Sequence, residues 1–159
     1  SFGGLISMEA TQAVDVDGLI LYEPPMPAVT VDQDHESIAS RMETLLAEGD
    51  REAAGRLFFE EATGAENVEQ WPIWPDCLTL AETMIRESAI VEEFRPDGLD
   101  LSVPTLLLTG EYSPDHLQTS IDVLEGRIPD TRRVELEGVG HAGMASAPGQ
   151  IATAVRGFL

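Results

Sequence analysis

Hydrophobic and polar positions along the chain change their spacing twice, which separates strand-rich ends from a helical middle. Compact apolar runs bounded by Gly or Pro predict buried parallel strands at Gly18–Tyr22 and Thr105–Thr109, and a third strand is expected at Arg133–Leu136. Apolar residues three and four positions apart predict amphipathic helices. These helices are expected at Leu5–Ala13, Ile38–Leu46, Arg51–Ala62, Leu78–Phe94, Asp115–Arg127 and Ala147–Leu159.

The order of these elements predicts an α/β fold that carries a helical insert. Residues 1–25 would hold a helix and the first strand, and residues 26–95 would form the insert. Residues 96–159 return to strands and helices in alternation. Loops are expected at Trp71–Pro75 and Gly138–Gly140.

Acidic residues dominate the charge of the chain. Its 159 residues include 29 Asp and Glu against 9 Arg and no Lys, so the formal net charge is −20. Nucleic-acid binding needs a basic patch, and this composition excludes one. The acids are spread over all the predicted helices except Ala147–Leu159, which resembles the surfaces of proteins from salt-accumulating halophiles. An acidic protein from a high-GC mesophile is the alternative.

The sequence also excludes two other classes of protein. No apolar run reaches the ~20 residues of a membrane-spanning helix. Cys77 is the single cysteine, so it cannot form an internal disulfide, and with scattered histidines it makes no zinc-binding set. A protein with a cytoplasmic location and no metal is expected.

Two residues near glycines can carry nucleophilic chemistry. Ser1 precedes a predicted helix, and His141 follows the Gly138–Gly140 loop. A serine hydroxyl becomes a good nucleophile only when a base removes its proton, and histidine titrates near neutral pH. His35, which is flanked by acids that favour a solvated position, and His116, which lacks a Gly-rich loop, compete for the role of base.

These segments and the strands between them resemble the C-terminal half of the α/β-hydrolase family, over essentially the whole chain. Ser1-Phe2-Gly3-Gly4 is similar to the second half of the family's nucleophile elbow, G-x-S-x-G. The resemblance implies the C-terminal part of an α/β-hydrolase parallel sheet, with residues 26–95 as a helical cap. It also implies that Ser1 is the nucleophile, that His141 is the base and that the Phe2 N–H belongs to the oxyanion hole.

The acid of the implied catalytic triad has several candidates. In most relatives it lies three residues beyond the Gly that ends the strand before the His strand, and Ser113 occupies that place here, after Gly110. Glu23 stands at the end of the strand that follows the nucleophile helix, where haloalkane dehalogenase types place their acid. Asp115 and Glu111 are the other candidates. Glu23 is favoured, with Asp115 as the alternative.

The resemblance implies a serine hydrolase that cleaves an ester, thioester or lactone through an acyl-enzyme, without a cofactor. An acyltransferase and a non-catalytic ligand-binding protein are the alternatives. The expected partners are a small-molecule substrate, the N-terminal half of the same protein, which would cover the edge of the first strand, and a second copy in a homo-oligomer. Several apolar residues of the cap either line an acyl pocket or pack within the cap: Phe58, Phe59, Trp71, Ile73, Trp74 and Met84.

Overall fold

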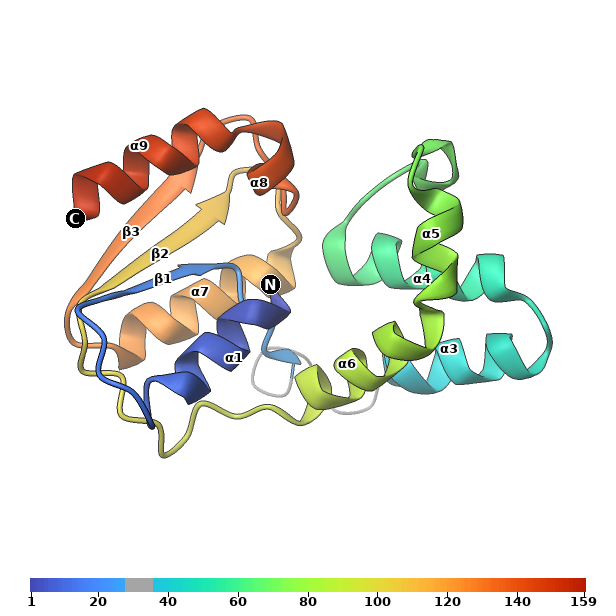
Figure 1. Cartoon of the computed structure of the whole chain (residues 1–159), viewed down its shortest axis with the longest axis horizontal. Coiled ribbons are helices and arrows are strands. Elements are labelled where there is room, and N and C mark those ends of the chain that lie inside the picture. The colour runs from blue at the N-terminus through green and yellow to red at the C-terminus, as the bar shows by residue number, and fades with distance from the viewer. Residues whose placement is uncertain (28–35) are drawn as a thin grey trace. The chain divides into compact units, whose positions relative to one another are not determined.

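The computed structural model describes residues 1–27 and 36–159, which form two compact units (Figure 1). One unit comprises Ser1–Val31 and Phe94–Leu159, and the other comprises Asp32–Glu93. We call them the sheet unit and the helical unit. His35, a candidate base, lies outside the described residues. No helix in the described ranges is long and apolar enough to cross a membrane.

Three parallel strands form the centre of the sheet unit. They are β1 (Leu19–Tyr22), β2 (Thr105–Gly110) and β3 (Thr131–Leu136), in the spatial order β1-β2-β3. Every residue of β2 is buried, as the apolar run predicts for a central parallel strand. The strand β3 begins two residues earlier than expected, because it pairs with β2 along its whole length.

Helices cover both faces of this sheet (Figure 1). One face carries α1 (Phe2–Ala10) and α7 (Asp115–Arg127), and the other carries α9 (Pro148–Phe158) with the short α8 (Gly143–Ser146) before it. Side chains alternate along a strand, so Leu106 and Leu108 of β2 both pack toward α9, against Ile151. The predicted helix at Leu5–Ala13 instead begins at Phe2 and ends at Ala10, so the Phe2 N–H lies in its first turn.

The outer side of β1 has no strand partner among the described residues. Ile20, in the middle of β1, is 39% exposed, although its neighbours Leu19 and Leu21 are buried. An apolar strand with a free edge favours pairing with a further strand. The parallel sheet that the resemblance implies is confirmed, with β1 at one edge.

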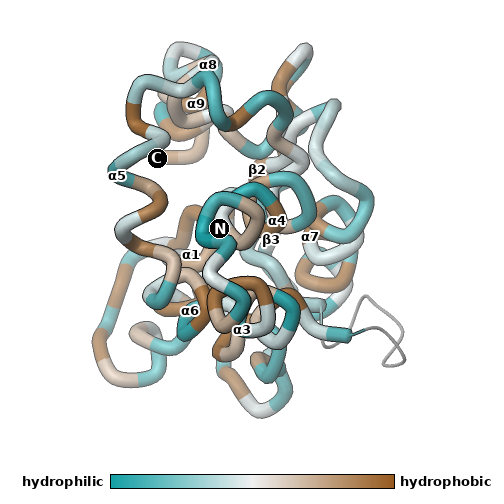
Figure 2. Tube along the Cα trace, turned by 90° about the vertical axis from the view of Figure 1, so that its right-hand side faces the viewer, coloured by the Kyte–Doolittle hydropathy of each residue, from teal (hydrophilic) through white to brown (hydrophobic). Residues whose placement is uncertain are grey.

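The helical unit contains α3 (Ile38–Ala47), α4 (Arg51–Thr63), the 3₁₀ turn η1 (Val68–Gln70), α5 (Trp74–Thr79) and α6 (Ala81–Glu93). Hydrophobic and hydrophilic residues alternate along α3 and α6 (Figure 2). The apolar sides of α3, α4 and α6 meet in a core that includes Met42, Ala54 and Met84. The Ser37 and Asp50 side chains cap α3 and α4 by accepting backbone N–H groups.

Two expectations about this unit are wrong in detail. The predicted loop Trp71–Pro75 contains the start of α5, because Pro75 lies in the first turn of that helix, where no N–H is needed. The single helix expected over Leu78–Phe94 is broken at Leu80, so α5 and α6 are separate helices.

Most of the aromatic residues that were candidates for an acyl pocket pack against one another. The Phe59 ring meets the Phe58 and Trp71 rings edge to face, with ring centres 5.2 Å apart in each pair. Trp74 is buried, whereas Ile73 is exposed. Packing within the helical unit therefore accounts for these aromatic side chains.

Candidate active site

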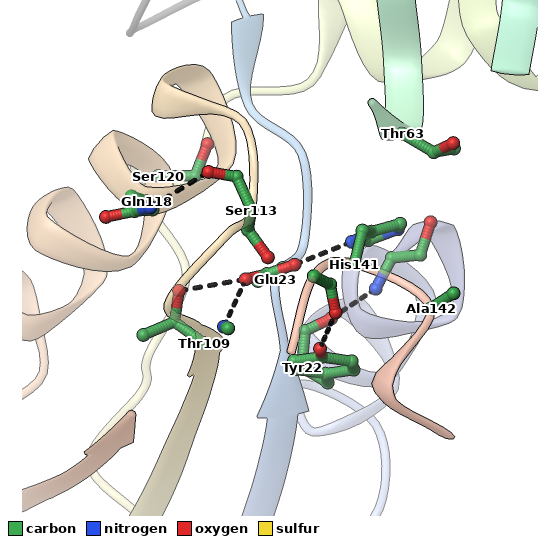
Figure 3. A network of polar contacts seen from close by, with 12 residues as sticks. Tyr22, Glu23, Thr63, Thr109, Ser113, Gln118, Ser120, His141 and Ala142 are labelled. Atoms are coloured by element: carbon green, nitrogen blue, oxygen red, sulfur yellow. Dashed lines mark hydrogen bonds and ion pairs between the residues drawn. The ribbon is translucent and has the colours of Figure 1, made fainter. Parts of the chain in front are cut away.

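Glu23 directly follows β1, and its carboxylate is completely buried (Figure 3). Its Oε1 accepts hydrogen bonds from Thr109 Oγ1 at 2.8 Å and from the Gly110 N–H at 2.7 Å, both at the end of the neighbouring strand β2. The Glu23 backbone has a φ of 42°, a left-handed conformation that costs on the order of 1–3 kcal/mol in a residue with a side chain. Both strand ends thus hold one acid in a fixed and strained position.

The other oxygen of this carboxylate meets His141. Glu23 Oε2 lies 2.7 Å from His141 Nδ1, and the His141 side chain is 10% exposed (Figure 3). His141 lies in the loop between β3 and α8, which begins with a turn at Gly138, where φ is 69°. Since Nδ1 faces a carboxylate, it carries the proton in the neutral ring, which leaves Nε2 as the basic nitrogen.

Opposing effects set the pKa of the Glu23 carboxyl. Burial alone would raise this pKa, but the hydrogen bonds with His141, Gly110 and Thr109 stabilise the carboxylate and bring the pKa below its usual value. The Ser113 hydroxyl lies beside this carboxylate, yet it is buried without meeting the geometry of a hydrogen bond. Glu23 is therefore ionised at neutral pH.

Tyr22, the last residue of β1, touches the same histidine. Its ring stacks on the His141 imidazole with ring centres 6.0 Å apart and planes inclined by 21°. Its hydroxyl donates a hydrogen bond to the Gly140 carbonyl. Burial, together with the nearby Glu23 charge, raises the pKa of the Tyr22 phenol to about 12.

Ser1 is next to these strand ends. The Ser1 backbone nitrogen donates a hydrogen bond to the Tyr22 carbonyl. Helix α1 approaches β1 closely at Gly4, where an added Cβ would lie 3.0 Å from Pro24 Cβ. Ser1 is exposed, and no hydrogen bond between its hydroxyl and His141 is formed within the described residues. Catalytic hydrogen bonds are often long in unliganded enzymes and tighten with substrate.

The other candidate acids and bases lie elsewhere. Asp115 is exposed in the first turn of α7. Glu111 accepts the Gly138 N–H at 2.7 Å, so it stabilises the turn that leads to His141. His116 is the second residue of α7, and its carbonyl accepts the Ser120 hydroxyl. Within the ranges that the structure describes, no cluster of His, Cys, Asp and Glu could hold a metal ion.

Solved structures match the fold over nearly the whole chain. An α/β hydrolase from Sphaerobacter thermophilus is 26% identical, with a TM-score of 0.68, and the match covers 96% of this chain and 65% of that one. The α/β hydrolase MGS-M2 from a deep-sea metagenome is 17% identical, with a TM-score of 0.72 and coverage of 99% and 62%. The enol-lactonase from Burkholderia xenovorans is also 17% identical, with a TM-score of 0.66 and coverage of 99% and 62%.

The chain has the fold of the C-terminal portion of α/β-hydrolases. It spans less than two thirds of the length of each of these three structures. The matched structures are mostly described as hydrolytic enzymes, although one is described as a peroxidase, so the fold alone does not specify a substrate. No protein-family model matches the sequence, and no curated protein matches it significantly.

Sequence analysis missed several residues that surround Glu23 and His141 in this α/β-hydrolase fold. Thr109 and Gly110 could have been found, because the carboxyl ends of adjacent parallel strands meet at one edge of a sheet. Tyr22 carries a weaker signal, since an aromatic residue at the end of a buried strand is usually a packing residue. Ser113 was noted only because it occupies the position at which most relatives have the acid of the triad.

Proposed function

We propose that the whole protein, meaning this chain with any residues that precede it, is a serine hydrolase that cleaves an ester, thioester or lactone. The observation that carries the proposal is the 2.7 Å contact between Glu23 Oε2 and His141 Nδ1. A buried, ionised acid that orients a histidine is the arrangement that makes the histidine a base toward a serine. Ser1 lies at the start of the helix next to this pair.

The reaction would proceed in two steps, acylation of Ser1 and hydrolysis of the acyl-enzyme. His141 Nε2 takes the Ser1 hydroxyl proton while Oγ bonds to the substrate carbonyl carbon, and the Phe2 N–H donates to the developing oxyanion. The tetrahedral intermediate collapses, the bond to the leaving alcohol or thiol breaks, and His141 returns the proton to it. Water then attacks the acyl-enzyme with His141 again as the base, which releases the acid and restores Ser1.

Glu23 supports this assignment because its burial and its backbone conformation cost folding free energy. A completely buried carboxylate and a left-handed backbone both oppose folding, and such features cluster at functional sites. The hydrogen bonds from Thr109 and Gly110 hold the carboxylate so that its second oxygen is directed at His141. In the proposed enzyme, Glu23 keeps His141 in the tautomer with the proton on Nδ1.

Covalent labelling with a fluorophosphonate tests the proposal, because such probes react with activated serines. We expect one label per whole protein, mapped by peptide mass spectrometry to Ser1, and no label in Ser1→Ala. Ser7→Ala is the matched control, since the Ser7 hydroxyl in the same helix donates to the Gly3 carbonyl and should not affect labelling. Labelling at another residue, or ester turnover that survives Ser1→Ala, would refute the assignment.

A further inference from the structure

Tyr22 lies close to the loop of His141 at three positions. Its ring lies against the imidazole of His141, and its hydroxyl donates to the carbonyl of Gly140, the residue before it. An added Cβ at Gly143 would overlap the Tyr22 hydroxyl, so the chain leaves room for the phenol at the start of α8. These contacts join the end of β1 to the loop on both sides of His141.

The contact with Glu23 cannot by itself fix the plane of the imidazole. A single hydrogen bond at Nδ1 holds one atom of the ring, and coupled rotations about χ1 and χ2 can still pivot the ring and move Nε2. An aromatic face packed nearly parallel to the imidazole removes that pivot. The Tyr22 ring, inclined by 21° to His141, has this orientation.

We propose that Tyr22 is a positioning residue for His141: its ring sets the plane of the imidazole, and its hydroxyl holds the Gly140 carbonyl. This inference rests on the proposed role of His141 as the base. The raised pKa of Tyr22, about 12, keeps the phenol protonated through neutral and mildly alkaline pH, so its hydrogen bond persists where the enzyme would work. The aromatic face also favours the imidazolium that forms as His141 accepts the serine proton.

Two substitutions separate the hydroxyl from the ring. Tyr22→Phe removes only the hydrogen bond to Gly140, and we expect kcat to fall about fivefold. Tyr22→Leu removes the ring as well, and we expect kcat to fall on the order of 10²-fold, the usual cost of a small misplacement of a reacting group. KM should stay within about twofold for both, because a positioning residue does not touch the substrate. Tyr112→Phe is the matched control, since the Tyr112 ring is 71% exposed and should leave kcat unchanged.

Proton NMR gives a readout that a loss of stability would not produce. In the whole protein, the hydrogen-bonded proton between His141 Nδ1 and Glu23 should give a downfield signal that persists in Tyr22→Phe and Tyr112→Phe and broadens in Tyr22→Leu. Unchanged kcat in both Tyr22 variants would overturn the inference, as would an increase in KM at constant kcat. If Tyr22→Leu does not fold, Tyr22→Phe alone tests the inference, and an unchanged kcat in that variant would overturn it.

These experiments also distinguish a failure of the role of Tyr22 from a failure of the proposed function. If fluorophosphonate labels Ser1 in the parent protein but the Tyr22 variants retain full activity, only the role of Tyr22 is wrong. If Ser1 is not labelled in the parent protein, the proposed function itself fails.

Discussion

The two units of the molecule place their polar residues differently. Among the described residues, most buried polar side chains lie in the sheet unit: Glu23, Thr105, Thr109, Ser113 and Ser120. The helical unit buries only Ser88 among its described polar side chains, and it displays its charges as exposed pairs such as Arg51–Glu82. Burial of a polar group costs free energy unless it is fully hydrogen-bonded. The polar side chains of the helical unit therefore cost little folding free energy, while the sheet unit contains buried polar groups that the stability of the fold does not explain.

Backbone strain shows the same difference. Among the residues that the structure describes, each unit has one non-glycine residue with a positive φ, Glu23 in the sheet unit and Asn67 in the helical unit. Asn adopts this conformation readily, because its short polar side chain can hydrogen-bond locally. Glutamate is not among the residues that adopt this conformation readily. Strain in the sheet unit thus coincides with the proposed catalytic acid, whereas in the helical unit it falls on a residue suited to it.

The largest expected effect belongs to the sheet unit. In the whole protein, Ser1→Ala and His141→Ala should each lower kcat by roughly 10⁶-fold, because nucleophile and base act as a unit. Combining both substitutions should cost little more than either alone. Steady-state kinetics with a nitrophenyl ester, on variants whose circular dichroism is unchanged, checks this. Additive losses would contradict the shared mechanism.

A core substitution in the helical unit should act on stability instead. Met42 is completely buried, so Met42→Ala should lower the free energy of unfolding by about 2–5 kcal/mol. Urea unfolding followed by tryptophan fluorescence checks this, since both tryptophans of the chain, Trp71 and Trp74, lie in this unit. Glu48→Gln, at an exposed position after α3, is the control. A loss below about 1 kcal/mol would show that this core is less well packed than the structure indicates.

The sequence predicted most of the fold, for a physical reason. Apolar spacing reports which face of an element is buried, and this information located all three strands and the helices on both sides of the sheet. It did not locate the break at Leu80, because the residues on both sides of it keep a helical spacing. It also missed the start of α5, since Pro75 was assigned to a loop and not to the first turn of a helix.

The candidate site was less predictable. Ser1, His141 and Glu23 were named from the resemblance and from their places at helix and strand ends. The left-handed backbone of Glu23 and the contact between Tyr22 and His141 depend on how three strand ends meet, which local patterns do not encode. Thr109 was taken as part of an apolar strand, and its hydrogen bond to Glu23 became visible only when the two strands were paired.

Acid titration compares a buried carboxylate with an exposed one. The folded-state pKa of Glu23 lies below its ordinary value of 4.5, so its contribution to stability is full above that pH and is lost as pH falls through the folded-state pKa. A hydrogen bond from Arg51 lowers the pKa of the exposed Glu82 to about 2, but salt screens such a pair. Glu23→Gln should reduce the fall in the free energy of unfolding at acid pH, both in dilute buffer and in molar KCl. Glu82→Gln should do so only in dilute buffer, and the reverse pattern would contradict the comparison.

Salt should have the smallest effect. Surface pairs such as Arg41–Glu61 contribute about 0–1 kcal/mol each and weaken in salt, while screening relieves the repulsion of a net charge of −20. If the charge is a halophilic adaptation, the melting temperature of the whole protein should rise as KCl approaches molar concentration. Calorimetry checks this, and a flat melting temperature would leave the mesophilic alternative.

The central claim is that Glu23, and not Asp115, orients His141. Steady-state kinetics of the whole protein tests it most directly. Glu23→Gln should lower kcat on the order of 10⁴-fold, because the base remains but loses its tautomer and orientation. Asp115→Asn should stay within about tenfold of the parent, because substitution of an exposed residue in the first turn of a helix usually has small effects. A large loss in Asp115→Asn with near-normal activity in Glu23→Gln, both variants being folded by circular dichroism, would contradict the account.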